Sequence, residues 1–147
     1  MNKLLFIALI LLAQALNAQS TQNLQQQFDS LYKIPSRLKE TIALGQKILS
    51  TAPKLTTADS ILFGKNALRV GLCMFKTGQH DSVEMLAQTA YTFAAPNSDD
   101  HLTALQIIGI LRVLFSDYST GDSMHEVVLE KRRKYFGPNH LTDIRML

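Results

Sequence analysis

Along residues 19–147, apolar residues recur at helical spacing in blocks that short polar segments separate. No run of alternating apolar and polar positions rich in β-branched residues interrupts these blocks. The pattern therefore predicts an all-α fold. Six helices are expected, over residues 21–32, 36–51, 57–77, 82–94, 99–118 and 123–136.

Polar residues at the helix starts support these boundaries. Asp81 precedes Glu84 by three residues, and Ser123 precedes Glu126 by three. Each pair fits a capping box, in which two side chains satisfy backbone donors that the helix leaves unpaired. Ser98 is followed by two aspartates and predicts an N-cap with negative charge at the positive end of the helix dipole.

The spacing of turn residues indicates a repeat. Pro53 and Pro96 lie 43 residues apart, as do Gly78 and Gly121; these two glycines and Gly137 are expected just past helix ends. At the same shift Leu62 falls on Leu105, Arg69 on Arg112, Val70 on Val113 and Phe93 on Phe136. Such a period predicts a solenoid of helix pairs over residues 19–53, 54–96 and 97–138, with a fourth pair beginning after them.

Two stretches resemble the tetratricopeptide repeat (TPR) family. The first carries a glycine, a turn glycine, small residues and a proline, in Gly71, Leu72, Met74, Gly78, Val83, Ala87, Ala90 and Pro96; the second, residues 129–140, looks like the end of a kinesin-light-chain-type repeat. Val83, Met74, Pro96 and Leu141 depart from the family pattern. The resemblance implies a right-handed α-solenoid whose concave groove binds a protein or peptide and has no chemistry of its own.

The first 18 residues differ from the rest of the chain. Lys3 precedes an apolar run over residues 4–13, and small residues follow up to Ala18. This layout predicts a signal peptide, hence a periplasmic or secreted protein that begins at residue 19, although Ala15 offers a second cleavage position. A retained membrane anchor is the alternative, but the run is about half of the roughly 20 residues that a bilayer requires.

Composition and charge exclude little. The formal net charge is +3, and it falls to +2 without Lys3, which is too weak to indicate a nucleic-acid partner. The basic run over residues 131–134 complements the negative end of its helix. Cys73 is the single cysteine, so the chain forms no internal disulfide and Cys73 is expected in the core.

No catalytic or metal-binding pattern is recognised. The four histidines, His80, His101, His125 and His140, lack a second His or Cys at ligand spacing, and Leu129 stands where the zinc-protease motif beginning at His125 requires a histidine. The acidic pair before His101 is read as helix capping. We therefore expect no enzyme activity, no metal and no cofactor.

One helical face is the predicted binding surface. Lys65, Arg69, Leu72 and Lys76 follow one another at spacings of four, three and four residues, and one repeat later Arg112 and Phe115 occupy equivalent positions. The TPR resemblance implies that this face lines the groove, where it would suit an acidic peptide with apolar side chains. A solvated face that serves solubility explains the same residues.

The expected function is therefore an exported, non-enzymatic protein-interaction scaffold. The alternative is the extracytoplasmic sensor segment of a longer signal-transduction protein; a small helical hydrolase would require a cluster that the sequence does not display. Residues 142–147 resemble the start of a further helix with apolar residues and no polar cap. This end is predicted to self-associate.

Overall fold

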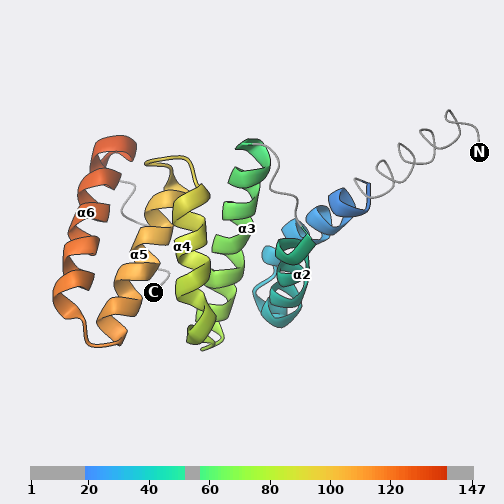
Figure 1. Cartoon of the computed structure of the whole chain (residues 1–147), viewed down its shortest axis with the longest axis horizontal. Coiled ribbons are helices and arrows are strands. Elements are labelled where there is room, and N and C mark those ends of the chain that lie inside the picture. Colours follow the sequence, from blue (N-terminus) through green and yellow to red (C-terminus); the bar gives the residue numbers. More distant parts are fainter. Residues whose placement is uncertain (1–18, 52–56, 139–147) are drawn as a thin grey trace, which may run out of the picture. The chain divides into compact units, whose positions relative to one another are not determined.

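The computed structural model describes residues 19–51 and 57–138, and over these ranges the chain is all-α, without a strand (Figure 1). The chain divides into two compact units, Met1–Ala52 and Pro53–Leu147, which are described separately. The predicted signal peptide, the turn at Pro53 and the start of a fourth helix pair lie outside the described ranges.

The first unit contains a helix over residues 19–32, a 3-10 turn η1 over Pro35–Arg37 and helix α2 over Leu38–Thr51. Pro35 stands at the start of η1, where its fixed backbone conformation suits the first position of a helix. Phe28 is fully buried, and Ile42 and Ile48 of α2 are buried with it in the core.

The second unit is a row of four helices in which each packs on the next in chain order (Figure 1). Helix α3 covers Thr57–Lys76, α4 Val83–Phe93, α5 Asp99–Leu114 and α6 Tyr118–Phe136, with the 3-10 turn η2 at His80–Ser82. The buried residues are mainly small or branched and include Ala67, Val70, Val83, Ala87, Ala90, Leu102, Leu111 and Val128. Small side chains at the crossings allow close packing of helices.

The six helices are confirmed, but the break between the last two was misplaced. Helix α5 ends at Leu114 rather than at residue 118, and α6 begins at Tyr118 rather than at residue 123. Ser116 adopts a left-handed conformation with φ of 70°, which ends α5, and the Asp117 carboxylate accepts a hydrogen bond from the Thr120 N–H at 3.4 Å. An aspartate N-cap thus starts α6 five residues early.

Both capping-box predictions were wrong. Ser123 lies inside α6 and donates its hydroxyl hydrogen bond to the Ser119 carbonyl at 2.8 Å. Helix α4 starts after Ser82 without a side-chain cap, and Glu84 accepts a hydrogen bond from Arg112 instead. The Ser98 cap is confirmed, since its hydroxyl oxygen accepts a hydrogen bond from the His101 N–H at 3.2 Å.

Of the three glycines predicted just past helix ends, two are found there and one is not. Gly78 and Gly137 lie past helix ends with φ of 75° and 84°, as predicted. Gly121 is instead buried in the first turn of α6, where an added Cβ would lie 2.7 Å from the Gly109 carbonyl oxygen and would collide with Val113. The match of Gly78 to Gly121 at a 43-residue shift was therefore wrong, because one glycine permits a turn and the other a helix crossing.

A shift of 38 residues relates the two hairpins of the second unit. A Cβ added at Gly71 would lie 3.4 Å from the Leu86 Cβ, and one added at Gly109 would lie 3.2 Å from the Met124 Cβ. The Gln79 N–H donates to the Met74 carbonyl at 2.9 Å after Gly78, and the Asp117 N–H donates to the Arg112 carbonyl at 2.8 Å after Ser116. The crossing points and both helix-ending turns thus recur at the same interval.

Candidate functional site

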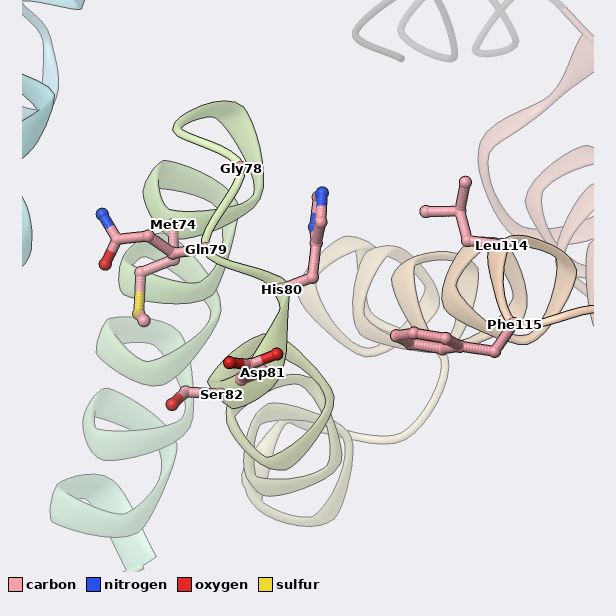
Figure 2. A pocket seen from close by; sticks show the side chains of 8 residues that line it. All are labelled: Met74, Gly78, Gln79, His80, Asp81, Ser82, Leu114 and Phe115. Atoms are coloured by element: carbon pink, nitrogen blue, oxygen red, sulfur yellow. The ribbon is translucent and has the colours of Figure 1, made fainter.

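An open cavity of about 680 Å³ lies in the second unit, between the turn after α3 and the carboxyl end of α5. Figure 2 shows the turn bearing His80 and Asp81 on one side and the last residues of α5 on the other. The lining residues are Met74, Gly78, Gln79, His80, Asp81, Ser82, Leu114 and Phe115. We call this cavity the α3–α5 cleft.

Two left-handed turns shape the walls of the cleft. Gly78 lets the chain leave α3 and run back into η2, while the Thr77 hydroxyl donates to carbonyl oxygens of the last turn of α3. Ser116 ends α5 in the same conformation, directly after Phe115. Both turns satisfy carbonyl oxygens in the last turn of their helix and so end it. The cleft lies beside these two helix ends.

The α5 wall is apolar and exposed. Leu114 is 55% exposed and Phe115 is 65% exposed, whereas Met74 on the α3 side is buried. In Figure 2 the Phe115 ring extends from the end of α5 toward η2. Full burial of side chains of this size contributes about 1.5 to 3 kcal/mol each, so neighbouring exposed positions favour a partner that covers them.

The η2 wall is polar. The His80 ring lies against Phe75 in an edge-to-face contact at 5.1 Å between ring centroids. Its Nδ1 atom is buried and finds no hydrogen-bond partner among the residues that the structure describes. Asp81 is exposed and supplies the single carboxylate among the eight lining residues. The cleft therefore joins an apolar wall to a wall with a carboxylate and an imidazole.

The predicted stripe on α3 lies elsewhere. Lys65, Arg69 and Leu72 are half-buried and Lys76 is exposed. Helical spacing places these four residues on the side of α3 opposite to Met74, which lines the cleft. The α3 stripe and the α3–α5 cleft are therefore different surfaces.

The predicted continuation of the stripe on α5 is not one face. Arg112 Nη2 donates to Glu84 Oε1 of α4 at 2.5 Å, with the two side chains 42% and 32% exposed, so this cation is already paired. Ile108 and Ser119 correspond to Lys65 and Lys76 at the predicted 43-residue shift; Ile108 is buried, and Ser119 belongs to α6. Of the six predicted groove residues, Phe115 alone is found in the cleft.

Little in the sequence indicates that Met74, His80 and Leu114 line a cleft. Met74 was noted for its place in the repeat, and His80 was considered as a metal ligand, but neither was assigned to a binding surface. Leu114 was read as part of a helix that continued to residue 118. The left-handed turn at Ser116, which ends α5 after Phe115, has no glycine to mark it.

The basic run at the end of α6 contains a buried arginine that pairs with an exposed aspartate. Arg132 is 3% exposed, donates from Nη2 to the Thr103 hydroxyl at 2.8 Å and lies 3.3 Å from the Asp99 carboxylate. Its Nε is buried and finds no partner within the described part of the chain. Arg132 therefore joins α6 to the first turn of α5.

His101 belongs to the junction between α4 and α5. Its ring stacks on Tyr91 at 4.1 Å, and its Nδ1 lies 3.1 Å from the Tyr91 carbonyl oxygen. Burial lowers the pKa of His101 below its ordinary value; the Tyr91 carbonyl opposes this shift, and the positive charge of Lys131 adds to it. Among the residues that the structure describes, no three His, Cys, Asp or Glu side chains form a group able to hold a metal ion.

The described fold defines an all-α protein. Over residues 19–51 and 57–138, no helix combines the length and the apolar character needed to cross a membrane. Comparison of the chain with protein-family models, with curated proteins and with solved structures finds no match in any of the three.

Proposed function

We propose that this chain is a non-enzymatic interaction protein of the helical-repeat, TPR-like kind, and that it holds a segment of a partner protein in the α3–α5 cleft. The observation that carries the proposal is the adjacent exposure of Leu114 and Phe115 on one wall of an open cavity. Large apolar side chains that are exposed together in a concave site favour binding over solvation.

The recurrence of the hairpin supports the repeat part of the proposal. Crossing glycines and helix-ending turns return after 38 residues, within the range of helical repeat units. Each such unit buries its apolar face only against a neighbour, and stacked units form the concave surfaces with which repeat proteins bind their partners.

We further propose that the protein is exported and begins at residue 19. This proposal rests on the apolar run over residues 4–13 and on the small residues up to Ala18. In this setting the partner is another periplasmic or extracellular protein.

A pair of matched variants tests the cleft. Leu114→Ser combined with Phe115→Ser removes the apolar wall, whereas Met85→Ser changes an equally exposed side chain of α4, 63% exposed, that does not line the cleft. Partners retained from the exported proteins of the source cell are quantified for each variant, with circular dichroism as the folding check.

We expect the double variant to lose its specific partner by about tenfold or more, since two apolar anchors are removed, and the Met85→Ser protein to retain it. A partner recovered equally with all three proteins would mean that the cleft is not the binding site. Recovery of no specific partner by the unaltered protein would likewise contradict the proposed function.

A further inference from the structure

The lining of the α3–α5 cleft carries one formal charge. Asp81 contributes a carboxylate to the lining, and no lysine or arginine is among the eight lining residues. Arg112, the basic residue expected in this region, is paired with Glu84. The carboxyl ends of α3 and α5 border the cleft with the negative ends of their helix dipoles, and the amino end of α4, whose N-cap Ser82 is a lining residue, borders it with a positive end. The one formal charge among the lining side chains is therefore negative and would attract a cation, although the whole chain is positive.

An exposed aromatic ring stands opposite this carboxylate. Phe115 is 65% exposed and extends toward the η2 wall that bears Asp81 (Figure 2). The face of an aromatic ring attracts a cation, and a planar guanidinium stacks on it more readily than an ammonium. The same guanidinium presents donors in a fork that matches a carboxylate.

We infer that the cleft receives an arginine side chain of the partner segment, with the guanidinium between the Asp81 carboxylate and the Phe115 ring. The aliphatic part of the arginine, or an apolar neighbour in the segment, covers Leu114. This inference rests on the proposed function, because it names the chemistry of the segment that the cleft binds. It concerns the cleft, which is a different surface from the α3 stripe on which an acidic peptide was expected.

Three blocked pentapeptides with the sequence Gly-Leu-X-Leu-Gly distinguish the effect of the positive charge at X from the effect of its shape. X is arginine, citrulline or glutamate; citrulline keeps the shape of arginine and removes the charge. Binding is followed by the methyl NMR signals of Met74 and Leu114, which line the cleft, and dissociation constants come from titration of the purified protein. The signal of Met85, on α4, reports binding outside the cleft.

We expect the arginine peptide to bind about two- to fivefold more tightly than the citrulline peptide, as for one exposed ion pair, and the glutamate peptide to bind most weakly. Asp81→Asn should abolish the difference between arginine and citrulline, whereas Asp122→Asn, an exposed aspartate of α6, should leave it unchanged. Phe115→Leu should reduce the affinity for arginine by about two- to fivefold, and Phe115→Tyr should restore it.

Other results would contradict either the arginine inference alone or the proposed function as well. Tighter binding of citrulline or glutamate, or an arginine preference that survives Asp81→Asn, would overturn the arginine inference and leave the proposed function standing. Methyl signals that shift with protein concentration alone would assign the cleft to a second copy of the chain. Shifts confined to Met85, or no shift with any peptide, would overturn both the inference and the proposed function.

Discussion

The hairpins α3–α4 and α5–α6 share the position of their helix crossing and of the turn between their helices, but they differ in some of the residues that form them. At a shift of 38 residues, Gly71 corresponds to Gly109 and Leu86 to Met124 at the crossings. The left-handed position is Gly78 in the first hairpin and Ser116 in the second. The comparison teaches that backbone geometry repeats here where residue identity does not.

The substitutions between the hairpins also explain where the cleft's chemistry comes from. His80 and Asp81 of η2 correspond to Tyr118 and Ser119, which already belong to α6. The turn after α3 is thus a 3-10 segment that presents polar side chains to the cleft, whereas the turn after α5 passes directly into a helix. The carboxylate proposed to bind a cation belongs to the first hairpin alone.

The largest expected effect distinguishes the two crossings. Gly121→Ala places a Cβ 2.7 Å from the Gly109 carbonyl oxygen, so α5 and α6 must separate, and we expect a loss of about 1 to 3 kcal/mol in the free energy of unfolding. Gly71→Ala places its Cβ 3.4 Å from the Leu86 Cβ, an ordinary contact, and alanine favours the helix.

Urea denaturation of both variants measures this difference. The Gly71→Ala protein should be at least as stable as the unaltered protein. Equal destabilisation by the two substitutions would mean that α3 and α4 pack as closely as α5 and α6.

The helix boundaries and the glycines show how far the sequence predicted the fold. Helical periodicity located all six described helices. The serine before two aspartates located the Ser98 cap, and the glycines past helix ends located the turns at Gly78 and Gly137. Periodicity failed between Leu114 and Ser123, because Phe115 and Tyr118 extend the apolar pattern across a real helix end. A glycine serves turns and close crossings alike, so Gly121 was read as a turn residue.

The candidate site was less predictable than the fold. Phe115, predicted to line a groove, lines the α3–α5 cleft, whereas Arg112 is paired with Glu84, which lies 28 residues away in the sequence. Asp81 was read as a helix cap and belongs to the cleft lining. Spacing along one sequence gives the face of a helix, whereas the partner of a side chain depends on the packing of helices against each other.

A smaller effect tests the equivalence of the two left-handed turns. Ser116 holds φ of 70°, which costs an L-residue about 1 to 2 kcal/mol relative to glycine in that conformation. Glycine is more flexible in the unfolded chain, which offsets about half of this cost. We therefore expect Ser116→Gly to raise the free energy of unfolding by about 0.5 to 1 kcal/mol.

The reverse exchange is the matched control for this prediction. Gly78→Ser should lower the free energy of unfolding by a similar amount, since Gly78 holds φ of 75° and an added Cβ there meets no atom within 4 Å. Thermal unfolding measures both variants. If the two exchanges moved stability in the same direction, the turns would not be equivalent.

The smallest effect concerns the contact that joins the two hairpins, where His101 of α5 stacks on Tyr91 of α4. The pKa of His101 is lowered in the fold from its ordinary value of 6.5, first by burial. The unfolded chain therefore binds a proton more readily than the folded chain. The contribution of neutral His101 to stability is fully present above pH 6.5 and is lost as pH falls through the lower, folded-state pKa.

Replacing His101 by glutamine removes this titration while keeping a polar side chain at the junction. We expect the urea midpoint of the unaltered protein to fall more steeply than that of His101→Gln as pH decreases below 6.5, and the two slopes to agree above it. The comparison between proteins cancels the titration of the carboxylates that both share. Parallel curves throughout would mean that Tyr91 and His101 stack without favouring the neutral ring. A steeper fall for the glutamine variant would reverse the sign of the predicted shift. In either case the junction between the hairpins would depend on the packing of α4 against α5 and on the Arg112–Glu84 ion pair, with no contribution from the protonation state of His101.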